Sequence, residues 1–166
     1  MTESGDVILR KDEVRGGEAD DEERGRRGAR HWLSHSDAGG LTQFGAYVET
    51  LEPGSRSSER HWHEREDEFL LVLSGEATVV EDDGANALHA GDAACWPAGT
   101  PNAHYVANRS GAPCSYLIVG TRVTHDVCHY PDAGQVLRTE GEHWRMERVD
   151  GTLLKSGRCK SPPGRD

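Results

Sequence analysis

The hydrophobic positions of the chain fall in short runs with turn-forming residues between them. From Thr42 onward, runs of about four to eight residues rich in Val, Leu, Tyr and Thr alternate with clusters of Gly, Pro and Asp. Phe44, Ala46 and Val48 occupy alternate positions, which is the period of a strand with one buried face. No segment sustains a helical period. The pattern predicts an all-β domain, a barrel or sandwich of about eight short strands.

The two ends of the chain differ in composition from its middle. Residues 11–28 are dense in charge and Gly, so they bury too little apolar surface to offset the entropy of ordering. We therefore expect residues 1–28 to form a flexible charged arm whose removal costs little stability. Residues 29–130 are the predicted barrel. Residues 131–166 are a predicted extension with a disordered end, because Pro-Pro, Gly and charges follow Ser156.

Composition narrows the classes of function. A chain of 166 residues has room for one domain, and a net charge of −10 without a basic stripe argues against nucleic-acid binding. The longest apolar run, residues 69–73, is too short to span a membrane, and residues 1–10 lack the features of a signal peptide. The four cysteines form no C-x-x-C pair. We expect a cytoplasmic protein with free thiols.

The segment with the clearest chemistry follows Gly54. His61 and His63 are two residues apart in an expected strand, so both imidazoles point to one face and Trp62 to the other. Glu68 follows after a short turn, which we expect to bring its carboxylate onto the adjacent strand. Nitrogen and oxygen donors together suit a borderline divalent metal. A further ligand is expected from a distant strand, and His104 is the candidate.

Two motifs in this region resemble those of the cupin superfamily, of the small single-domain type. The first motif of that family joins a glycine, H-x-H, a glutamate and a second glycine. It corresponds here, with one extra residue before the histidines, to Gly54, His61, His63, Glu68 and Gly75. The second motif joins a glycine, P-x-G, a histidine and an asparagine, and corresponds to Gly91, Pro97, Gly99, His104 and Asn108. The resemblance implies a jelly roll, or double-stranded β-helix, with a metal inside one mouth of the barrel.

The second motif, residues 91–108, departs from the family in its spacing. Four residues, rather than two, separate Gly99 from the histidine. Aligned from the P-x-G turn, Asn102 takes the ligand position; aligned from the other end, His104 takes it. We choose His104, because imidazole binds a transition metal far better than a carboxamide does. Asn102 and Trp96 are then predicted to line the substrate pocket.

A second cluster of metal-binding residue types, His125, Cys128 and His129, follows the last clear barrel strand. It precedes Tyr130-Pro131-Asp132, a typical turn. We interpret these residues as structural rather than as a second metal site.

The favoured function is a metal-dependent enzyme that acts on a small organic metabolite by oxygenase, isomerase or lyase chemistry. Three histidines and one glutamate leave coordination positions open for water, O₂ or a substrate oxygen. The cofactor is one divalent transition metal, with Fe, Mn, Ni, Cu and Zn all compatible. The sequence identifies no catalytic acid or base. The alternative is a non-catalytic module that binds or senses a metal or small ligand, because fold does not determine chemistry.

We also expect a homodimer. A barrel of this size exposes sheet edges, and residues 29–36 could add a strand to a neighbouring subunit.

Overall fold

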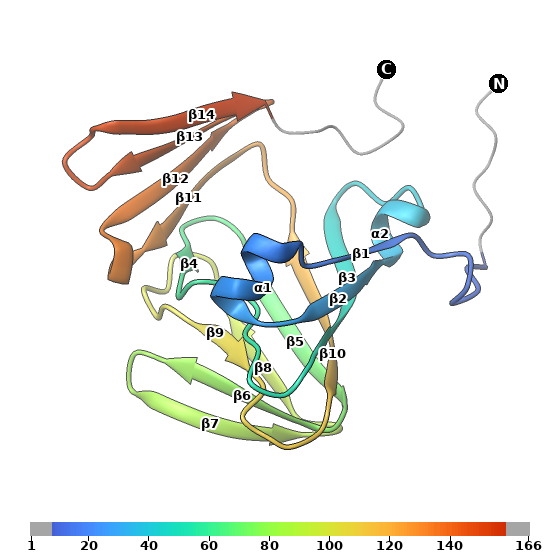
Figure 1. Ribbon diagram of the computed structural model, residues 1–166. Helices are drawn as coiled ribbons and strands as arrows, with labels where there is room; N and C mark the ends of the chain where they lie inside the picture. The colour runs from blue at the N-terminus through green and yellow to red at the C-terminus, as the bar shows by residue number, and fades with distance from the viewer. Residues whose placement is uncertain (1–7, 159–166) are drawn as a thin grey trace, which may run out of the picture.

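The computed structural model describes residues 8–158, which form three antiparallel sheets and little helix (Figure 1). The all-β jelly roll that the sequence predicts is confirmed. Within these residues, no helix combines the length and the apolar character needed to cross a membrane.

The first wall of the barrel is a six-stranded sheet in the order β1-β2-β3-β10-β5-β8. Its strands are β1 (Gly16–Glu18), β2 (Arg30–Ser34), β3 (Phe44–Leu51), β5 (Glu68–Ser74), β8 (Ala93–Trp96) and β10 (Cys114–Thr121). Strand β10 pairs along its whole length with β3 on one side, and it pairs with β5 on the other.

The opposite wall combines two sheets. A three-stranded sheet has the order β7-β6-β9, with β6 (Glu76–Glu81), β7 (Gly84–His89) and β9 (Tyr105–Ala107). A five-stranded sheet has the order β14-β13-β12-β11-β4. Its strands are β4 (Trp62–His63), β11 (His125–Tyr130), β12 (Gln135–Glu140), β13 (His143–Arg148) and β14 (Leu153–Arg158). Single bridges between Arg56 and Ala107 and between His61 and His104 join the two sheets.

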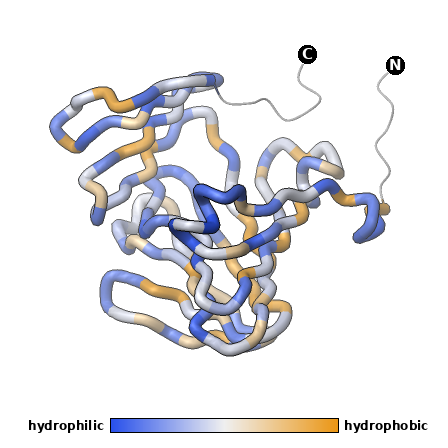
Figure 2. Tube along the Cα trace, in the orientation of Figure 1, coloured by the Kyte–Doolittle hydropathy of each residue, from blue (hydrophilic) through white to orange (hydrophobic). Residues whose placement is uncertain are grey.

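The hydrophobic core lies between the two walls. Figure 2 shows hydrophobic positions interleaved with hydrophilic ones along the strands, as expected when alternate side chains face inward. The buried cluster draws on both walls and consists of Leu51, Leu70, Val72, Ala77, Val79, Trp96, Val106, Cys114, Tyr116 and Ile118.

The structure corrects the prediction that residues 1–28 are a flexible arm. Residues 1–7 lie outside the described part, but β1 and helix α1 (Asp21–Arg27) are ordered and pack on the barrel. Val14 and Ala19 are buried. No residue of α1 is buried, and Figure 2 shows the helix to be hydrophilic throughout. The count of apolar residues did not predict this ordered segment, because polar contacts and backbone hydrogen bonds hold it on the barrel.

Those polar contacts begin at the helix cap. The side chain of Asp20 accepts a hydrogen bond from the backbone of Glu23, and Arg24 pairs with Glu18 at 2.7 Å. The carbonyl of Arg27 accepts a hydrogen bond of 2.7 Å from the backbone of Arg56. The helix is thereby attached to the loop that leads into β4.

The prediction for residues 29–36 also needs correction. This segment forms β2 and the short helix α2 (His35–Ala38), and β2 pairs with β1 and β3 of its own chain. It is therefore not a free edge for a neighbouring subunit. The homodimer itself stays a prediction.

The C-terminal extension is ordered further than the sequence predicts. After the short helix η1 (Pro131–Ala133), strands β12, β13 and β14 continue the sheet of β11 as a meander. Residues 156–158 belong to β14, and residues 159–166 lie outside the described part. The expected boundary at residue 130 falls within one sheet.

A pair of glycine substitutions tests the order of the N-terminal segment. Gly28 has φ of 84°, and a Cβ there would lie 2.5 Å from the hydroxyl and 2.8 Å from the Cα of Ser55. We expect Gly28→Ala to lower the free energy of unfolding by about 2 kcal/mol or more, from backbone strain and this clash. Gly25 lies in α1 with open space around it, so Gly25→Ala should raise that free energy by roughly 0.5–1 kcal/mol. Urea unfolding measures both, and a flexible segment would leave both values unchanged.

Candidate metal centre

His61 and His63 lie in the middle of the second wall, where residues 61–63 run between β9 and β11. His61 exchanges backbone hydrogen bonds with His104, and His63 lies opposite Cys128 of β11. Both imidazoles line the interior cavity. Trp62 points outward and stacks on His129 with ring centroids 4.1 Å apart. The alternation is that of a strand.

His104 and Glu68 meet the H-x-H pair from different directions. The Nε2 atom of His104 is 2.9 Å from Oε2 of Glu68, and the same oxygen is 3.9 Å from Nε2 of His61. The ring centroid of His61 is 5.1 Å from that of His104 and 5.3 Å from that of His63. The four side chains that the sequence selects are therefore gathered in one place.

The strand that carries Glu68 differs from the expected one. Glu68 begins β5, which belongs to the six-stranded sheet, whereas His63 lies in β4 of the opposite wall. The turn over residues 64–67 therefore crosses the barrel instead of forming a hairpin between adjacent strands. The carboxylate faces the histidines across the interior.

Hydrogen bonds at Nδ1 fix the orientation of the three imidazole rings. Nδ1 of His61 and of His104 lie 2.9 and 3.2 Å from backbone carbonyl oxygens two residues earlier. Nδ1 of His63 is 2.6 Å from Oδ2 of Asp126. Carbonyl and carboxylate oxygens accept hydrogen bonds, so each Nδ1 carries a hydrogen and Nε2 is the nitrogen left to bind a metal ion. Metal-binding histidines are oriented in this way.

Hydrogen bonds within the site shift the pKa values of Glu68 and His63 in opposite directions. Burial alone would raise the pKa of Glu68, but hydrogen bonds from His104 and His61 outweigh it and hold that pKa well below its usual range. Burial would lower the pKa of His63, whereas the hydrogen bond with Asp126 raises it to about 11. A metal ion that binds to Nε2 of His63 therefore displaces a proton.

These residues fit a divalent transition metal. The ligand atoms of His61, Glu68 and His104 all lie within 4.8 Å of one another. Three imidazole nitrogens and a carboxylate oxygen form a mixed donor set that such ions accept. A metal ion bound by these Nε2 atoms would replace their hydrogens and bind Glu68 as the carboxylate.

Of the two residues predicted to line a substrate pocket, Trp96 lines the cavity and Asn102 does not. Trp96 lines the cavity and stacks on His104, with ring centroids 3.8 Å apart and an angle of 6°. Asn102 is not among the cavity-lining residues. Its amide donates a hydrogen bond of 2.8 Å to Glu81, which also accepts from the indole of Trp96. Asn102 thus supports Trp96 from outside the cavity.

The cavity beside the candidate ligands has a volume of about 300 Å³. Hydroxyl groups dominate the remaining polar lining, and they come from Tyr47, Ser57, Ser58, Tyr105, Tyr116 and Tyr130. Glu49 and Glu68 are its carboxylates, and Arg30 is its guanidinium. A cavity of this size and lining suits a small, hydroxylated ligand.

Strand β11 contributes residues that the sequence analysis did not assign to the site: it interpreted Cys128 as structural, placed Tyr130 in a turn and did not single out Asp126. Asp126, Cys128 and Tyr130 point toward the site: Asp126 bonds to His63, and the ring of Tyr130 is 5.8 Å from that of His61. The sulfur of Cys128 and a ring nitrogen of each of His61 and His63 lie within 4.8 Å of one another. The sequence signal that could have identified them is their spacing of two residues, which places all three on one face of a strand.

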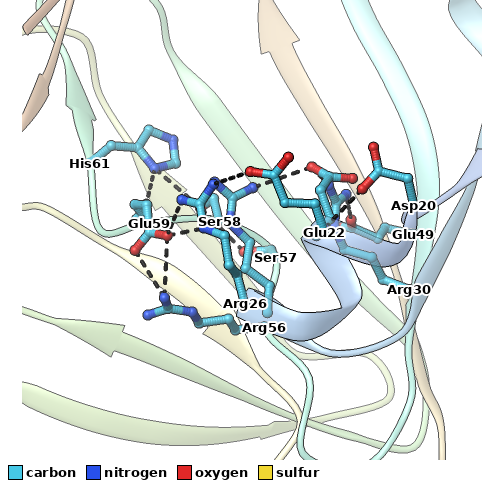
Figure 3. Close-up of polar contacts among 12 residues, drawn as sticks. Asp20, Glu22, Arg26, Arg30, Glu49, Arg56, Ser57, Ser58, Glu59 and His61 are labelled. Atoms are coloured by element: carbon cyan, nitrogen blue, oxygen red, sulfur yellow. Dashed lines mark hydrogen bonds and ion pairs between the residues drawn. The ribbon is translucent and has the colours of Figure 1, made fainter.

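An ion-pair cluster fixes the loop that precedes His61 (Figure 3). Glu59 accepts from Arg56 at 3.0 Å and from Arg26 at 3.3 Å, and its backbone carbonyl is the acceptor for His61. Arg30 pairs with Glu49 at 2.7 Å. Glu59 therefore joins helix α1 and the loop to the backbone contact that orients His61.

Comparison with known proteins supports the fold and the site region. The sequence model of the family described as Cupin domain matches residues 47–120. A structure from Silicibacter pomeroyi, named a sugar phosphate isomerase from a cupin superfamily, is 36% identical, with 89% of this chain and 96% of that chain covered and a TM-score of 0.81. Among curated proteins, none matches the sequence.

Two further structures are similar over much of the chain. One from Acidithiobacillus ferrooxidans, provisionally named a sugar phosphate isomerase, is 26% identical over 89% of this chain and 96% of that chain, with a TM-score of 0.77. A predicted oxalate decarboxylase from Thermotoga maritima is 22% identical over 70% of this chain and 100% of that chain, with a TM-score of 0.59. The last similarity concerns the fold alone.

Two substitutions test which residue of the second motif binds metal. His104→Ala should lose most bound metal, because it removes an imidazole whose Nε2 lies 2.9 Å from Glu68. Asn102→Ala should keep its metal, with affinity reduced by at most about 10–100-fold, as for residues that only support a ligand. Elemental analysis of both variants, with folding verified by circular dichroism, makes the comparison. A metal-free Asn102→Ala beside a loaded His104→Ala would reverse the assignment.

Proposed function

Because the chain belongs to the cupin superfamily, we propose that it is a metal-dependent isomerase of small sugar phosphates, with one divalent transition metal bound by His61, His63, Glu68 and His104. The observation that carries this proposal is that His61, Glu68 and His104 form one donor group, with His63 beside His61, at a cavity inside the barrel that all four line. Nδ1 of each ring is engaged by a carbonyl or carboxylate oxygen, which leaves Nε2 to bind such an ion beside Glu68.

The substrate class is supported by likeness and by the lining of the cavity. The relative from Silicibacter pomeroyi matches almost the full length of this chain and is named a sugar phosphate isomerase. The cavity of about 300 Å³ lies at the small end of the range for ligand pockets, which is roughly 300–1,000 Å³. Its serine and tyrosine hydroxyls are suitable partners for the hydroxyl groups of a sugar.

Interconversion of an aldose and a ketose moves a proton between two neighbouring carbons and another between their oxygens. A bound metal supplies Lewis-acid stabilisation of the negative charge that develops on those oxygens. The protein must supply a base that takes the proton from one carbon and returns it to the other. Glu49 is the one carboxylate among the cavity-lining residues besides Glu68, and we assign it this role.

The surroundings of Glu49 fix its side chain in position. Its side chain is buried, bonded to Arg30 at 2.7 Å and to the hydroxyl of Tyr116. Burial, followed by the negative charge of Glu49, raises the pKa of Tyr116 well above its usual value. Tyr116 therefore remains a hydroxyl that donates to Glu49, and the carboxyl group of Glu49 is the one we assign to accept the proton from substrate.

Turnover in heavy water tests the proposed reaction. We expect the metal-loaded protein to interconvert aldose and ketose phosphates and to incorporate deuterium next to the carbonyl, and chelation should abolish both until metal is restored. Nuclear magnetic resonance follows a panel of phosphorylated sugars alongside their unphosphorylated counterparts, under air and under nitrogen. Saturable binding without conversion would instead favour a binding module, and oxygen consumption would favour an oxygenase.

The assignment of Glu49 predicts a specific loss. Glu49→Gln keeps the shape of the side chain but cannot accept the proton, so kcat should fall by about 10²–10⁴-fold. Metal content should stay unchanged, because Glu49 is not among the ligands. Glu76→Gln, on a half-exposed carboxylate of β6, is the matched control and should retain full activity. A loss of metal from Glu49→Gln, or normal turnover, would contradict the role.

A further inference from the structure

Cys128 lies directly beside the candidate metal ligands, although neither cupin motif contains it. It faces His63 across the pair formed by β4 and β11, and directly opposed residues of antiparallel strands project to the same face. Its side chain is buried, with 2% of its surface exposed. The thiol therefore points into the protein toward the H-x-H pair.

The distances make Cys128 part of the donor cluster. Its Sγ and the nearest ring nitrogens of His61 and His63 all lie within 4.8 Å of one another. The ligand atoms of His61, Glu68 and His104 meet the same limit. The two groups share His61, so an ion bound by the four motif residues has Cys128 next to two of its ligands.

We propose that Cys128 is a fifth ligand of the metal, bound through its thiolate. This inference rests on the metal site of the proposed function and adds a donor to it. When the ion binds, the S–H bond breaks, the sulfur donates its electron pair to the metal, and the proton leaves to solvent. A soft sulfur donor shifts the preference of the site away from Mn(II) and toward Zn(II) and other thiophilic ions.

A simpler role for Cys128 is a hydrogen bond from its thiol to His63, which would orient the ring without touching the metal. Spectroscopy separates the two roles, because only a bound thiolate gives a sulfur-to-metal charge-transfer band. Cobalt(II) is a suitable probe, and the other cysteines provide controls. Cys114 lies in the hydrophobic core and Cys95 is exposed on β8.

The experiment compares three full-length proteins loaded with cobalt(II): the natural sequence, Cys128→Ser, and a variant whose only cysteine is Cys128, made by Cys95→Ser, Cys114→Ser and Cys159→Ser. Bound cobalt is measured by elemental analysis on the same samples as the near-ultraviolet spectra. We expect the charge-transfer band in the natural sequence and in the single-cysteine variant. We expect Cys128→Ser to bind cobalt without the band.

X-ray absorption of the zinc-loaded natural sequence gives a reading that does not depend on a variant folding. It should show a sulfur neighbour at about 2.3 Å, the usual zinc–thiolate distance. Bound metal without the band or the sulfur neighbour would overturn the role of Cys128 and leave the motif ligands standing. A band that persists in Cys128→Ser would also overturn it. Failure of the natural sequence to bind any metal would overturn both this inference and the proposed function.

Discussion

Two backbone hydrogen bonds between His61 and His104 hold the candidate site together. The N–H of His104 donates to the carbonyl of His61 at 2.8 Å, and the reverse bond measures 3.1 Å. A pair that exchanges both bonds places its side chains on one face, so the two imidazoles meet even though they come from distant parts of the chain. The same bridge joins the β7-β6-β9 sheet to the sheet of β11. The bridge between His61 and His104 thus serves both the wall of the barrel and the geometry of the ligands, and the bridge between Arg56 and Ala107 supports the same wall.

The features that the sequence predicted correctly are those that neighbouring residues determine. Alternation along a strand correctly placed His61 and His63 on one face and Trp62 on the other, because side-chain direction has a period of two residues. Strand pairing is a long-range property, and there the predictions were less complete. The short turn before Glu68 was expected to lead to an adjacent strand, whereas it crosses to the opposite wall. The carboxylate still faces the histidines, since the interior of a small barrel is narrow enough for both walls to contribute.

Two features of the structure could not be predicted from the sequence. Helix α1 buries no side chain, so an argument from hydrophobic area could not detect it; its cap and ion pairs stabilise it on the barrel. The pairing of β11 with β4 likewise has no local signature. Asp126 and Cys128 reach the site through that pairing, and the sequence showed only that they share a face.

Strand β11 belongs at once to the barrel wall and to the C-terminal meander, and this has a thermodynamic consequence. The outermost strand β14 is largely exposed and β13 is exposed at half of its positions, so on their own these strands would open at low free-energy cost. An ion that binds only the folded site stabilises every element that must be in place for binding. Because Asp126 orients His63 from β11, occupancy of the site raises the free energy of opening that strand. Metal binding would then tie the opening of β11 to that of the barrel, while β13 and β14, which contribute no residue to the site, could still open first.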